Sequence, residues 1–219
     1  MKKVAILYDA SNDWISKFFP KDLNDISGYT FEFFYDPTKI KNYEIVFVLG
    51  YTRILGPSFL SNNKLAMVVH ESNLPEGKGF APLQWQILEG KNDITFSLIE
   101  INDQVDSGDI ILQSVLNLNG TELYDELRYK QSKITFDLVK EFLNIYPSFK
   151  RTKQQGKETF YKKRSIKHSE LNMDKTLREL FPLLRINNNN EWPSFFKYKG
   201  NKYILKIFKS QQDEENTSR

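Results

Sequence analysis

Residues 65–70 read Leu-Ala-Met-Val-Val-His, and this stretch carries the strongest indication of how the chain folds. Five consecutive apolar residues are typical of a strand that is buried on both faces of a parallel sheet. Two other runs, at residues 4–8 and 45–49, have the same length and a similar composition. Together the three runs predict the central strands of one sheet.

Apolar residues between and after these runs predict the remaining elements. Alternation and aromatic content indicate strands, whereas apolar residues three or four positions apart indicate helices. A proline in the first turn and a glycine after the last turn mark helix ends, and Thr121 is the expected N-cap of the longest helix. We expect helices at 13–19, 82–88, 121–145 and 175–184, and strands at 29–34, 94–101, 110–112, 194–198 and 203–208.

The alternation of strands and helices predicts an α/β fold: a Rossmann-like, open, mainly parallel sheet with a small C-terminal β-hairpin extension. We expect a core at residues 1–147, and an extension with a basic linker, a short helix and the hairpin at 148–210. A flexible polar tail should follow at 211–219. Ligands of such sheets bind beyond the carboxyl ends of the strands, so His70 is the first candidate for a functional residue.

The composition excludes several classes of function. The 219 residues include no cysteine and two histidines, which excludes a disulfide scaffold, a thiol nucleophile and a histidine-rich metal site. The 31 Lys and Arg nearly balance the 28 Asp and Glu, so no global field indicates a nucleic-acid partner. No apolar run approaches the roughly 20 residues of a membrane-spanning helix, and we expect a cytoplasmic protein without a membrane partner.

Two residues near the ends of predicted strands are candidates for proton transfer. His70 precedes a loop rich in Gly, Pro, Ser and Asn, a composition that brings backbone close to a ligand. Asp106 lies in a Val-Asp-Ser-Gly-Asp turn, and we expect both loops at the same edge of the sheet. A histidine that only caps its strand and an aspartate that only bonds its own turn are the structural alternatives. Together the two side chains are the minimum set for proton transfer by an oriented imidazole.

Two C-terminal features leave alternatives open. Residues 150–167 contain eight Lys or Arg and one Glu. Such a segment can bind phosphate groups or RNA, but more commonly it is a solvated loop. Trp192, Phe195 and Phe196 lie at the predicted hairpin, where they form its core or a subunit contact rather than a stacking surface. We expect a homodimer, because these aromatic side chains would otherwise be exposed.

Two motifs make the chain resemble a known family. Residues 70–79 read His-Glu-Ser-Asn-Leu-Pro-Glu-Gly-Lys-Gly, and residues 106–113 read Asp-Ser-Gly-Asp-Ile-Ile-Leu-Gln. In these motifs and in their separation the chain resembles the N10-formyltetrahydrofolate-dependent formyltransferases. The resemblance implies a formyltransferase core, N10-formyltetrahydrofolate as co-substrate, no metal, and His70 and Asp106 as the catalytic pair.

The resemblance also implies which residues bind the two substrates. It places the folate against Tyr51, Arg53, Ile54, Leu55 and Asp103. It places the second substrate near Ser72, Gly77, Lys78, Gly79 and Trp85, with Lys78 as a counter-charge for a diphosphate.

One position departs from the family pattern. Relatives carry an asparagine two residues before the histidine, and its amide donates to the developing oxyanion; here that position is Val68. Loss of one such donor costs on the order of 10²–10³ in rate. We expect Asn73, the nearest amide, to take its place, with Ser72 and protonated His70 as alternatives; otherwise the chain is a poor catalyst.

Residues 160–164 and 191–202 resemble the C-terminal part of bacterial sugar N-formyltransferases. This implies an acceptor amine on a nucleotide-linked amino-deoxy sugar, such as a dTDP- or GDP-4-amino-4,6-dideoxy hexose used for O-antigen and other surface polysaccharide. Methionyl-tRNA formyltransferase carries an additional C-terminal barrel, for which the residues after the long helix look too few. Glycinamide ribonucleotide formyltransferase has a glycine-rich first loop, whereas residues 8–13 lack glycine. A catalytically silent protein that binds folate or a nucleotide sugar is the alternative of a different class.

Overall fold

The computed structural model describes residues 1–26 and 28–210, so the tail expected at 211–219 lies outside the described residues. Contacts divide the chain into two units. The first unit comprises Met1–Leu118 and Arg128–Lys163, and the second comprises Asn119–Leu127 and Arg164–Arg219. In the described ranges no helix combines the length and the apolar composition that crossing a membrane requires.

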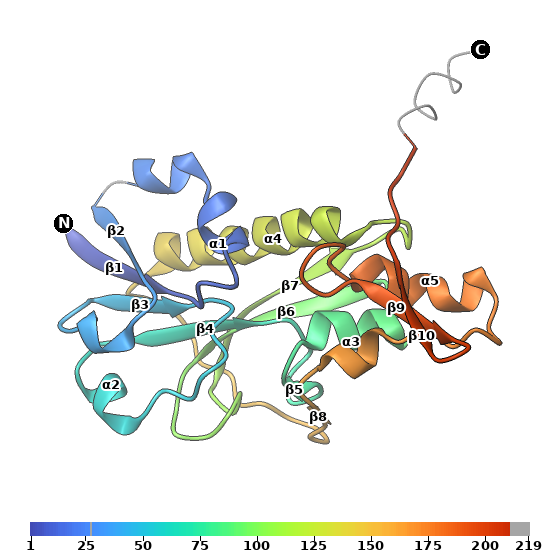
Figure 1. The fold of residues 1–219 in the computed structure, drawn as a ribbon. Coiled ribbons are helices and arrows are strands. Elements are labelled where there is room, and N and C mark those ends of the chain that lie inside the picture. Colours follow the sequence, from blue (N-terminus) through green and yellow to red (C-terminus); the bar gives the residue numbers. More distant parts are fainter. Residues whose placement is uncertain (27, 211–219) are drawn as a thin grey trace, which may run out of the picture. The chain divides into compact units, whose positions relative to one another are not determined.

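A six-stranded sheet forms the centre of the first unit, in the order β2-β1-β3-β4-β6-β7 (Figure 1). Strands β1 to β4 are parallel to one another, whereas β6 and β7 are antiparallel to their neighbours. The expected α/β fold with a mainly parallel sheet is therefore confirmed. The strands span Lys2–Leu7 (β1), Tyr29–Phe34 (β2), Ile45–Val48 (β3), Ala66–His70 (β4), Asp93–Glu100 (β6) and Ile110–Asn117 (β7).

Helices cover both faces of this sheet, which explains the nearly continuous apolar runs. Alternate side chains of a strand point to opposite faces. On one face Leu7 and Val46 belong to a buried cluster with Phe59 of α2 (Pro57–Ser61). On the other face the ring of Phe47 meets that of Phe142 of the long helix α4 edge to face, with centroids 5.9 Å apart.

Most helices lie near their predicted positions, but the expected start of α4 was wrong. Helix α4 begins at Tyr124, because the Glu126 carboxylate accepts from the Leu123 N–H at 2.8 Å. The Thr121 N–H is bound instead by the side chain of Asn119, so Thr121 belongs to a preceding turn. The helices span Trp14–Lys17 (α1), Pro57–Ser61 (α2), Pro82–Leu88 (α3), Tyr124–Ile145 (α4) and Leu177–Ile186 (α5), with 3-10 turns at Lys21–Asp25, Pro37–Lys39 and Ile166–Ser169.

The basic segment after α4 is tied to the first unit. Strand β8 (Phe160–Tyr161) pairs in parallel with β5 (Lys78–Gly79). The Arg151 guanidinium donates to the Glu100 carboxylate at 2.6 Å. These contacts place the residues up to Lys163 in the first unit.

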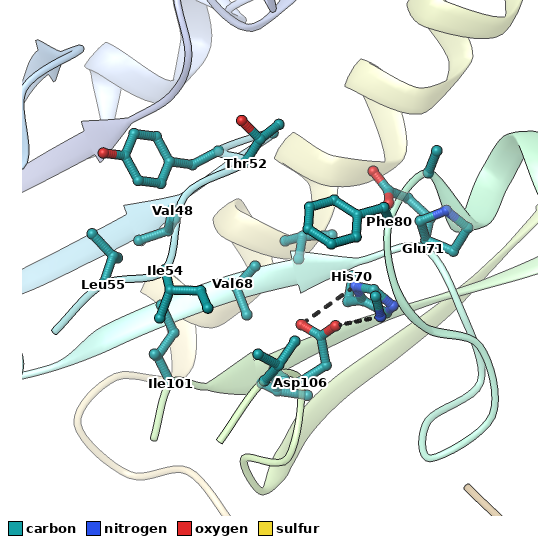
Figure 2. A pocket seen from close by; sticks show the side chains of 18 of the residues that line it. Val48, Thr52, Ile54, Leu55, Val68, His70, Glu71, Phe80, Ile101 and Asp106 are labelled. Atoms are coloured by element: carbon teal, nitrogen blue, oxygen red, sulfur yellow. Dashed lines mark hydrogen bonds and ion pairs between the residues drawn. The ribbon is translucent and has the colours of Figure 1, made fainter. Parts of the chain in front are cut away.

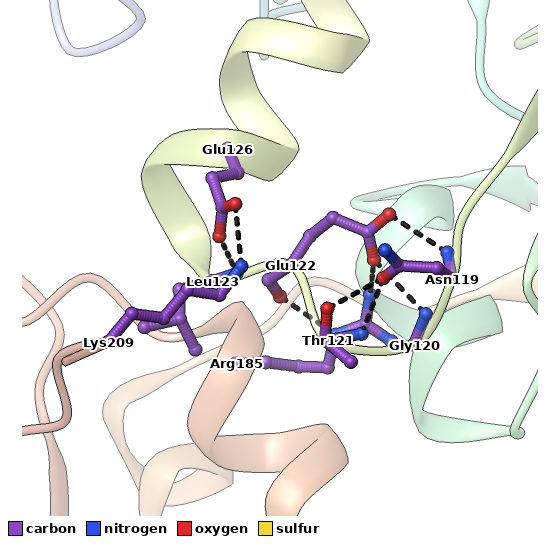
Figure 3. A network of polar contacts seen from close by, with 8 residues as sticks. All are labelled: Asn119, Gly120, Thr121, Glu122, Leu123, Glu126, Arg185 and Lys209. Atoms are coloured by element: carbon purple, nitrogen blue, oxygen red, sulfur yellow. Dashed lines mark hydrogen bonds and ion pairs between the residues drawn. The ribbon is translucent and has the colours of Figure 1, made fainter. Parts of the chain in front are cut away.

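The second unit contains α5 and the hairpin of β9 (Ser194–Tyr198) and β10 (Asn201–Leu205), which confirms the C-terminal strand pair. A buried ion pair joins Arg185 of α5 to Glu122, with 2.6 Å between nitrogen and oxygen (Figure 3). The Glu122 carboxylate also accepts from the N–H groups of Asn119 and Gly120. Burial lowers the pKa of Arg185, and the adjacent Glu122 opposes that shift.

Candidate active site

His70 is buried at the carboxyl end of β4, and both of its ring nitrogens have a partner. Its Nε2 lies 2.8 Å from the backbone oxygen of Gly77. A carbonyl oxygen only accepts hydrogen bonds, so Nε2 carries a proton. Nδ1 lies 3.6 Å from the Asp106 carboxylate. Nδ1 is therefore the nitrogen that can gain or lose a proton, and its protonated form is paired with Asp106.

Asp106 is held by its backbone and by its second carboxylate oxygen (Figure 2). Its φ of 49° lies in the left-handed region, which Asp and Asn tolerate better than most residues. Its Oδ2 accepts from the Gly79 N–H at 2.8 Å, leaving Oδ1 toward His70. Gly79 belongs to β5, so the pairing of β5 with β8 also positions Asp106.

The loop of Asp106 reaches His70 by a path different from the expected one. Because β6 is antiparallel to β4, the chain leaves β6 beside the first residue of β4, where the Ile101 N–H donates to the Ala66 oxygen. His70 is the last residue of β4. The expectation that both loops lie at one edge of the sheet was wrong, since the loop at 101–109 starts at the opposite end and folds back to His70.

Gln154 and Gly108 support this folded-back loop. The Gln154 amide donates to the backbone oxygens of Asp106 and Gly108, each at 2.8 Å. A Cβ on Gly108 would lie 1.5 Å from the Glu100 oxygen, so only glycine fits there. Gln154 lies in the basic segment, whose sequence contains no signal for a contact with Asp106.

A cavity of about 400 Å³ lies against the His70–Asp106 pair, and all its lining residues belong to the first unit. The five residues predicted to bind folate all line it: Tyr51, Arg53, Ile54, Leu55 and Asp103. Figure 2 shows apolar side chains on one side of the pair, namely Val48, Ile54, Leu55, Val68 and Ile101. Glu71 lies on the other side, beside Phe80.

The segment at 50–55 is fixed by the loop that follows β1. The backbone N–H and the hydroxyl of Thr52 donate to the Asp9 carboxylate at 2.7 and 2.6 Å. The Arg53 guanidinium lies 4.8 Å from the ring centre of Tyr51. Burial raises the pKa of the Tyr51 phenol, against the lowering effect of Arg53. Strands β1 and β3 flank the point where the strand order reverses, which is where open α/β sheets bind ligands.

Most residues predicted to contact the second substrate do not line the cavity. Of the five predicted residues, Gly79 lines the cavity. The cavity is not lined by the other four, which are Ser72, Gly77, Lys78 and Trp85. The Lys78 side chain is 1% exposed, and its ammonium donates to Glu158 at 2.5 Å and to Ser107 at 3.0 Å. The indole of Trp85 donates to the Lys162 oxygen at 2.9 Å. Lys78 and Trp85 thus support β5 and the loop of Asp106.

Asn73, the expected substitute for the family's asparagine, also lies away from the cavity. It is exposed, and its amide oxygen accepts from Gln113 at 3.2 Å. The cavity contains polar residues that the sequence did not indicate, namely Asn12, Glu71, Asn102, Gln104, Arg128 and Gln131. Arg128 and Gln131 come from α4, where their spacing gives no sign of a site. No group of three or more metal-ligating side chains is found in the described part of the chain.

The family model of the formyl transferases matches residues 34–139, the segment that includes His70, Asp106 and most of the residues that line the cavity. A curated relative is the methionyl-tRNA formyltransferase of Clostridioides difficile (strain 630), 30% identical over 189 residues. The alignment covers 84% of this chain and 60% of that relative, so the chain spans about three fifths of its length.

Solved formyltransferases share the fold along nearly the whole chain. A methionyl-tRNA formyltransferase from Clostridium thermocellum superposes with a TM-score of 0.81 at 22% identity, covering 98% of this chain and 96% of that one. A 4-N formyltransferase from Francisella tularensis superposes with a TM-score of 0.68 at 19% identity, covering 94% of this chain and 97% of that one. HypX from Aquifex aeolicus in complex with tetrahydrofolic acid superposes with a TM-score of 0.72 at 12% identity. The superposition covers 93% of this chain and 37% of HypX. The formyltransferase fold therefore includes the C-terminal hairpin.

Proposed function

We propose that this chain transfers a formyl group from N10-formyltetrahydrofolate to a primary amine. The single observation that carries the proposal is the His70–Asp106 pair on the wall of a cavity that is lined mostly by the segment matching the formyl transferase family model. An attacking amine must lose a proton, so it requires a base beside it. An imidazole is such a base, because imidazole exchanges a proton near neutral pH.

In this proposal the two residues have separate roles. Nδ1 of His70 accepts the proton that the amine gives up, because Nε2 is occupied by the Gly77 oxygen. The Asp106 carboxylate, 3.6 Å away, stabilises the resulting imidazolium. The orientation of the Asp106 carboxylate is maintained by the Gly79 N–H, and the Gln154 amide holds the backbone of the same loop.

The cavity wall suits a folate co-substrate. Val48, Leu55 and Ile101 supply an apolar surface, and Tyr51 with Arg53 supplies a ring face and a charge at the same wall. These are the groups that would hold a flat heterocycle with an anionic tail. The bound co-substrate would supply the activated formyl group. Tetrahydrofolic acid in HypX, a protein of the same fold, supports this assignment.

We propose a nucleotide-linked amino sugar as the acceptor, with dTDP- and GDP-4-amino-4,6-dideoxy sugars first. The resemblance at residues 160–164 and 191–202 supports it. A second candidate, methionyl-tRNA, is favoured by the curated relative of 30% identity. A homodimer through the hairpin belongs to the same proposal, and Tyr198, Tyr203 and Ile204, each about half exposed, would lie in its interface.

The proposal is tested by incubating the protein with N10-formyltetrahydrofolate and a panel of acceptors. The panel contains dTDP-, GDP- and UDP-linked 3- and 4-amino sugars and methionyl-tRNA. Release of tetrahydrofolate is followed by absorbance, and formylation of the acceptor by mass spectrometry. Turnover with one acceptor supports formyl transfer and identifies the class of acceptor, whereas folate binding without turnover favours a silent binding protein.

Asp106→Asn tests the catalytic pair. Asparagine tolerates the positive φ and still accepts from Gly79, so the fold should persist while the charge facing His70 is lost. We expect turnover to fall about 10²- to 10⁴-fold with an unchanged melting temperature. The matched control is Asp109→Asn in the same loop, which removes only an ion pair with Lys153 and should retain activity. Near-normal turnover of Asp106→Asn would contradict the assigned roles.

A further inference from the structure

Glu71 follows His70 directly and lines the same cavity, yet the proposed transfer assigns it no role. In Figure 2 its side chain lies beside Phe80, on the side of the catalytic pair opposite to the apolar wall. The apolar wall suits the folate, so Glu71 lies where the second substrate would enter. A carboxylate at this place requires an explanation, because Glu71 is only partly exposed and removing a charge from water is costly unless the charge has partners.

Two glutamines hold Glu71 in position. Its backbone oxygen accepts from the Gln86 amide at 2.6 Å, and its Oε1 accepts from the Gln131 amide at 2.6 Å. Gln131 is 3% exposed, so its own orientation is restricted by packing. Within the described residues this bond engages Oε1, and no hydrogen bond is found to the other carboxylate oxygen, Oε2. The side chain is therefore oriented, with one oxygen left for a ligand.

Among the contacts of the described residues, Arg128 is linked to Glu71 through Gln131. Its guanidinium donates to the Gln131 amide oxygen at 2.6 Å and lies 5.7 Å from the ring centre of Trp14. A carboxylate that served stability alone would be expected to form the direct, two-pronged pair that guanidinium groups favour. The intervening amide instead leaves the negative charge of Glu71 directed at the cavity. The other titratable groups that line the cavity are Tyr51, Arg53, His70, Asp103, Asp106 and Arg128.

We propose that Glu71 is an acceptor-binding residue that takes the ammonium form of the acceptor amine and places its nitrogen beside His70. This inference rests on the proposed formyl transfer to a primary amine. Amines of this kind are largely protonated at neutral pH, and a carboxylate binds an ammonium through short, charge-assisted hydrogen bonds. Glu71 thus selects an amino acceptor over a hydroxyl one. The bound ammonium releases one proton to solvent before it attacks, and His70 takes the second proton from the attacking nitrogen and returns it to the folate nitrogen N10 as the bond between N10 and the formyl carbon breaks.

Glu71→Gln tests the inference by kinetics. Glutamine keeps an oxygen for the Gln131 amide and removes only the charge. With dTDP-4-amino-4,6-dideoxyglucose at pH 7 we expect the KM for the sugar to rise about tenfold or more, with kcat and the KM for the folate unchanged. The difference should shrink near pH 9, where the amine is mostly neutral. The control is Glu76→Gln, an exposed carboxylate of the same loop that does not line the cavity.

A binding measurement keeps this test separate from the proposed function. Calorimetry compares dTDP-4-amino-4,6-dideoxyglucose with dTDP-6-deoxyglucose, in which a hydroxyl replaces the amine. The wild type should prefer the amino sugar about tenfold, and Glu71→Gln should lose that preference. Equal affinity of the wild type for both sugars, or binding of neither, overturns the inference even if another acceptor is formylated. An intact preference without any formyl transfer would refute the proposed function and leave the ammonium site standing.

Discussion

Val68 gives the cavity an apolar surface at the point where the family resemblance implies an amide. The structure does not supply the amide from the expected neighbours. Asn73 is exposed and bonded to Gln113, and the buried hydroxyl of Ser72 does not line the cavity. Nε2 of His70 is bonded to the Gly77 oxygen, and Nδ1 is the nitrogen that the proposed transfer uses for the proton of the amine. None of the three expected substitutes is therefore placed to donate to the oxyanion in the way that the family's amide would.

Val68→Asn should raise the rate of formyl transfer. The side chain is half-buried and faces the cavity, so an amide there keeps contact with solvent or substrate. One added oxyanion donor is worth up to 10²–10³ in rate, and we expect kcat to increase about tenfold or more. Val68→Leu, which adds bulk without a donor, should bring no gain. An unchanged kcat in Val68→Asn would mean that another group already stabilises the oxyanion.

At the scale of elements, the geometry of the site depends on short segments that support one another. Strands β5 and β8 contribute two residues each, yet their pairing holds the Gly79 N–H against Asp106. The loop at 101–109 folds back only because Gly108 allows the backbone to approach Glu100. The His70–Asp106 pair is thus positioned by backbone contacts as much as by side chains.

Gly108→Ala should disrupt this loop. The added Cβ would lie 1.5 Å from the Glu100 oxygen, so the loop or the end of β6 must move. We expect the free energy of unfolding to fall by about 3 kcal/mol, since overpacking costs 1–3 kcal/mol or more, and turnover to be lost because Asp106 shifts with the loop. Urea unfolding and an activity assay measure the two effects.

Gly56→Ala is the matched control for this substitution. A Cβ at Gly56 meets no atom within 4 Å, and its φ of −78° suits alanine. We expect its stability to change by less than about 1 kcal/mol and its activity to persist. Equal behaviour of the two variants would show that the close approach at Gly108 is unimportant.

At the scale of the whole molecule, the site and the most deeply buried ion pair belong to different units. Every residue that lines the cavity lies in the first unit. The Arg185–Glu122 pair lies in the second, with side chains 4% and 2% exposed. Removal of one partner of such a pair is costly, because a charge remains buried without compensation.

Glu122→Gln should therefore lower the stability of the protein without changing its chemistry. We expect a loss of about 3–5 kcal/mol in the free energy of unfolding, with kcat of the folded fraction unchanged. The control is Glu126→Gln, whose pair with Lys209 is about half exposed and should contribute less than about 1 kcal/mol. A stability loss as small as the control's would show that the buried charge finds another partner.

The amino-acid sequence alone indicated most of the longer strands and helices and the two catalytic candidates, whereas it did not indicate α2, β5 or β8. Residues 65–70 and the two similar runs predicted β4, β1 and β3, because burial on both faces leaves an unbroken apolar pattern that is local in the chain. The motifs that contain His70 and Asp106 also indicated the segment that lines the cavity. The ends of α4, α5 and β10 were less predictable, since single capping bonds decide them.

Only the tertiary structure decided how these parts meet. The antiparallel direction of β6 is a property of strand pairing, so it alone revealed that the Asp106 loop folds back from the opposite end of the sheet. The burial of Lys78 and the contact from Gln154 depend on a segment about fifty or more residues distant. Glu71 acquired a defined orientation only through Gln131 on α4. Local patterns record which side chains are buried, whereas contacts between distant segments follow from the path of the chain.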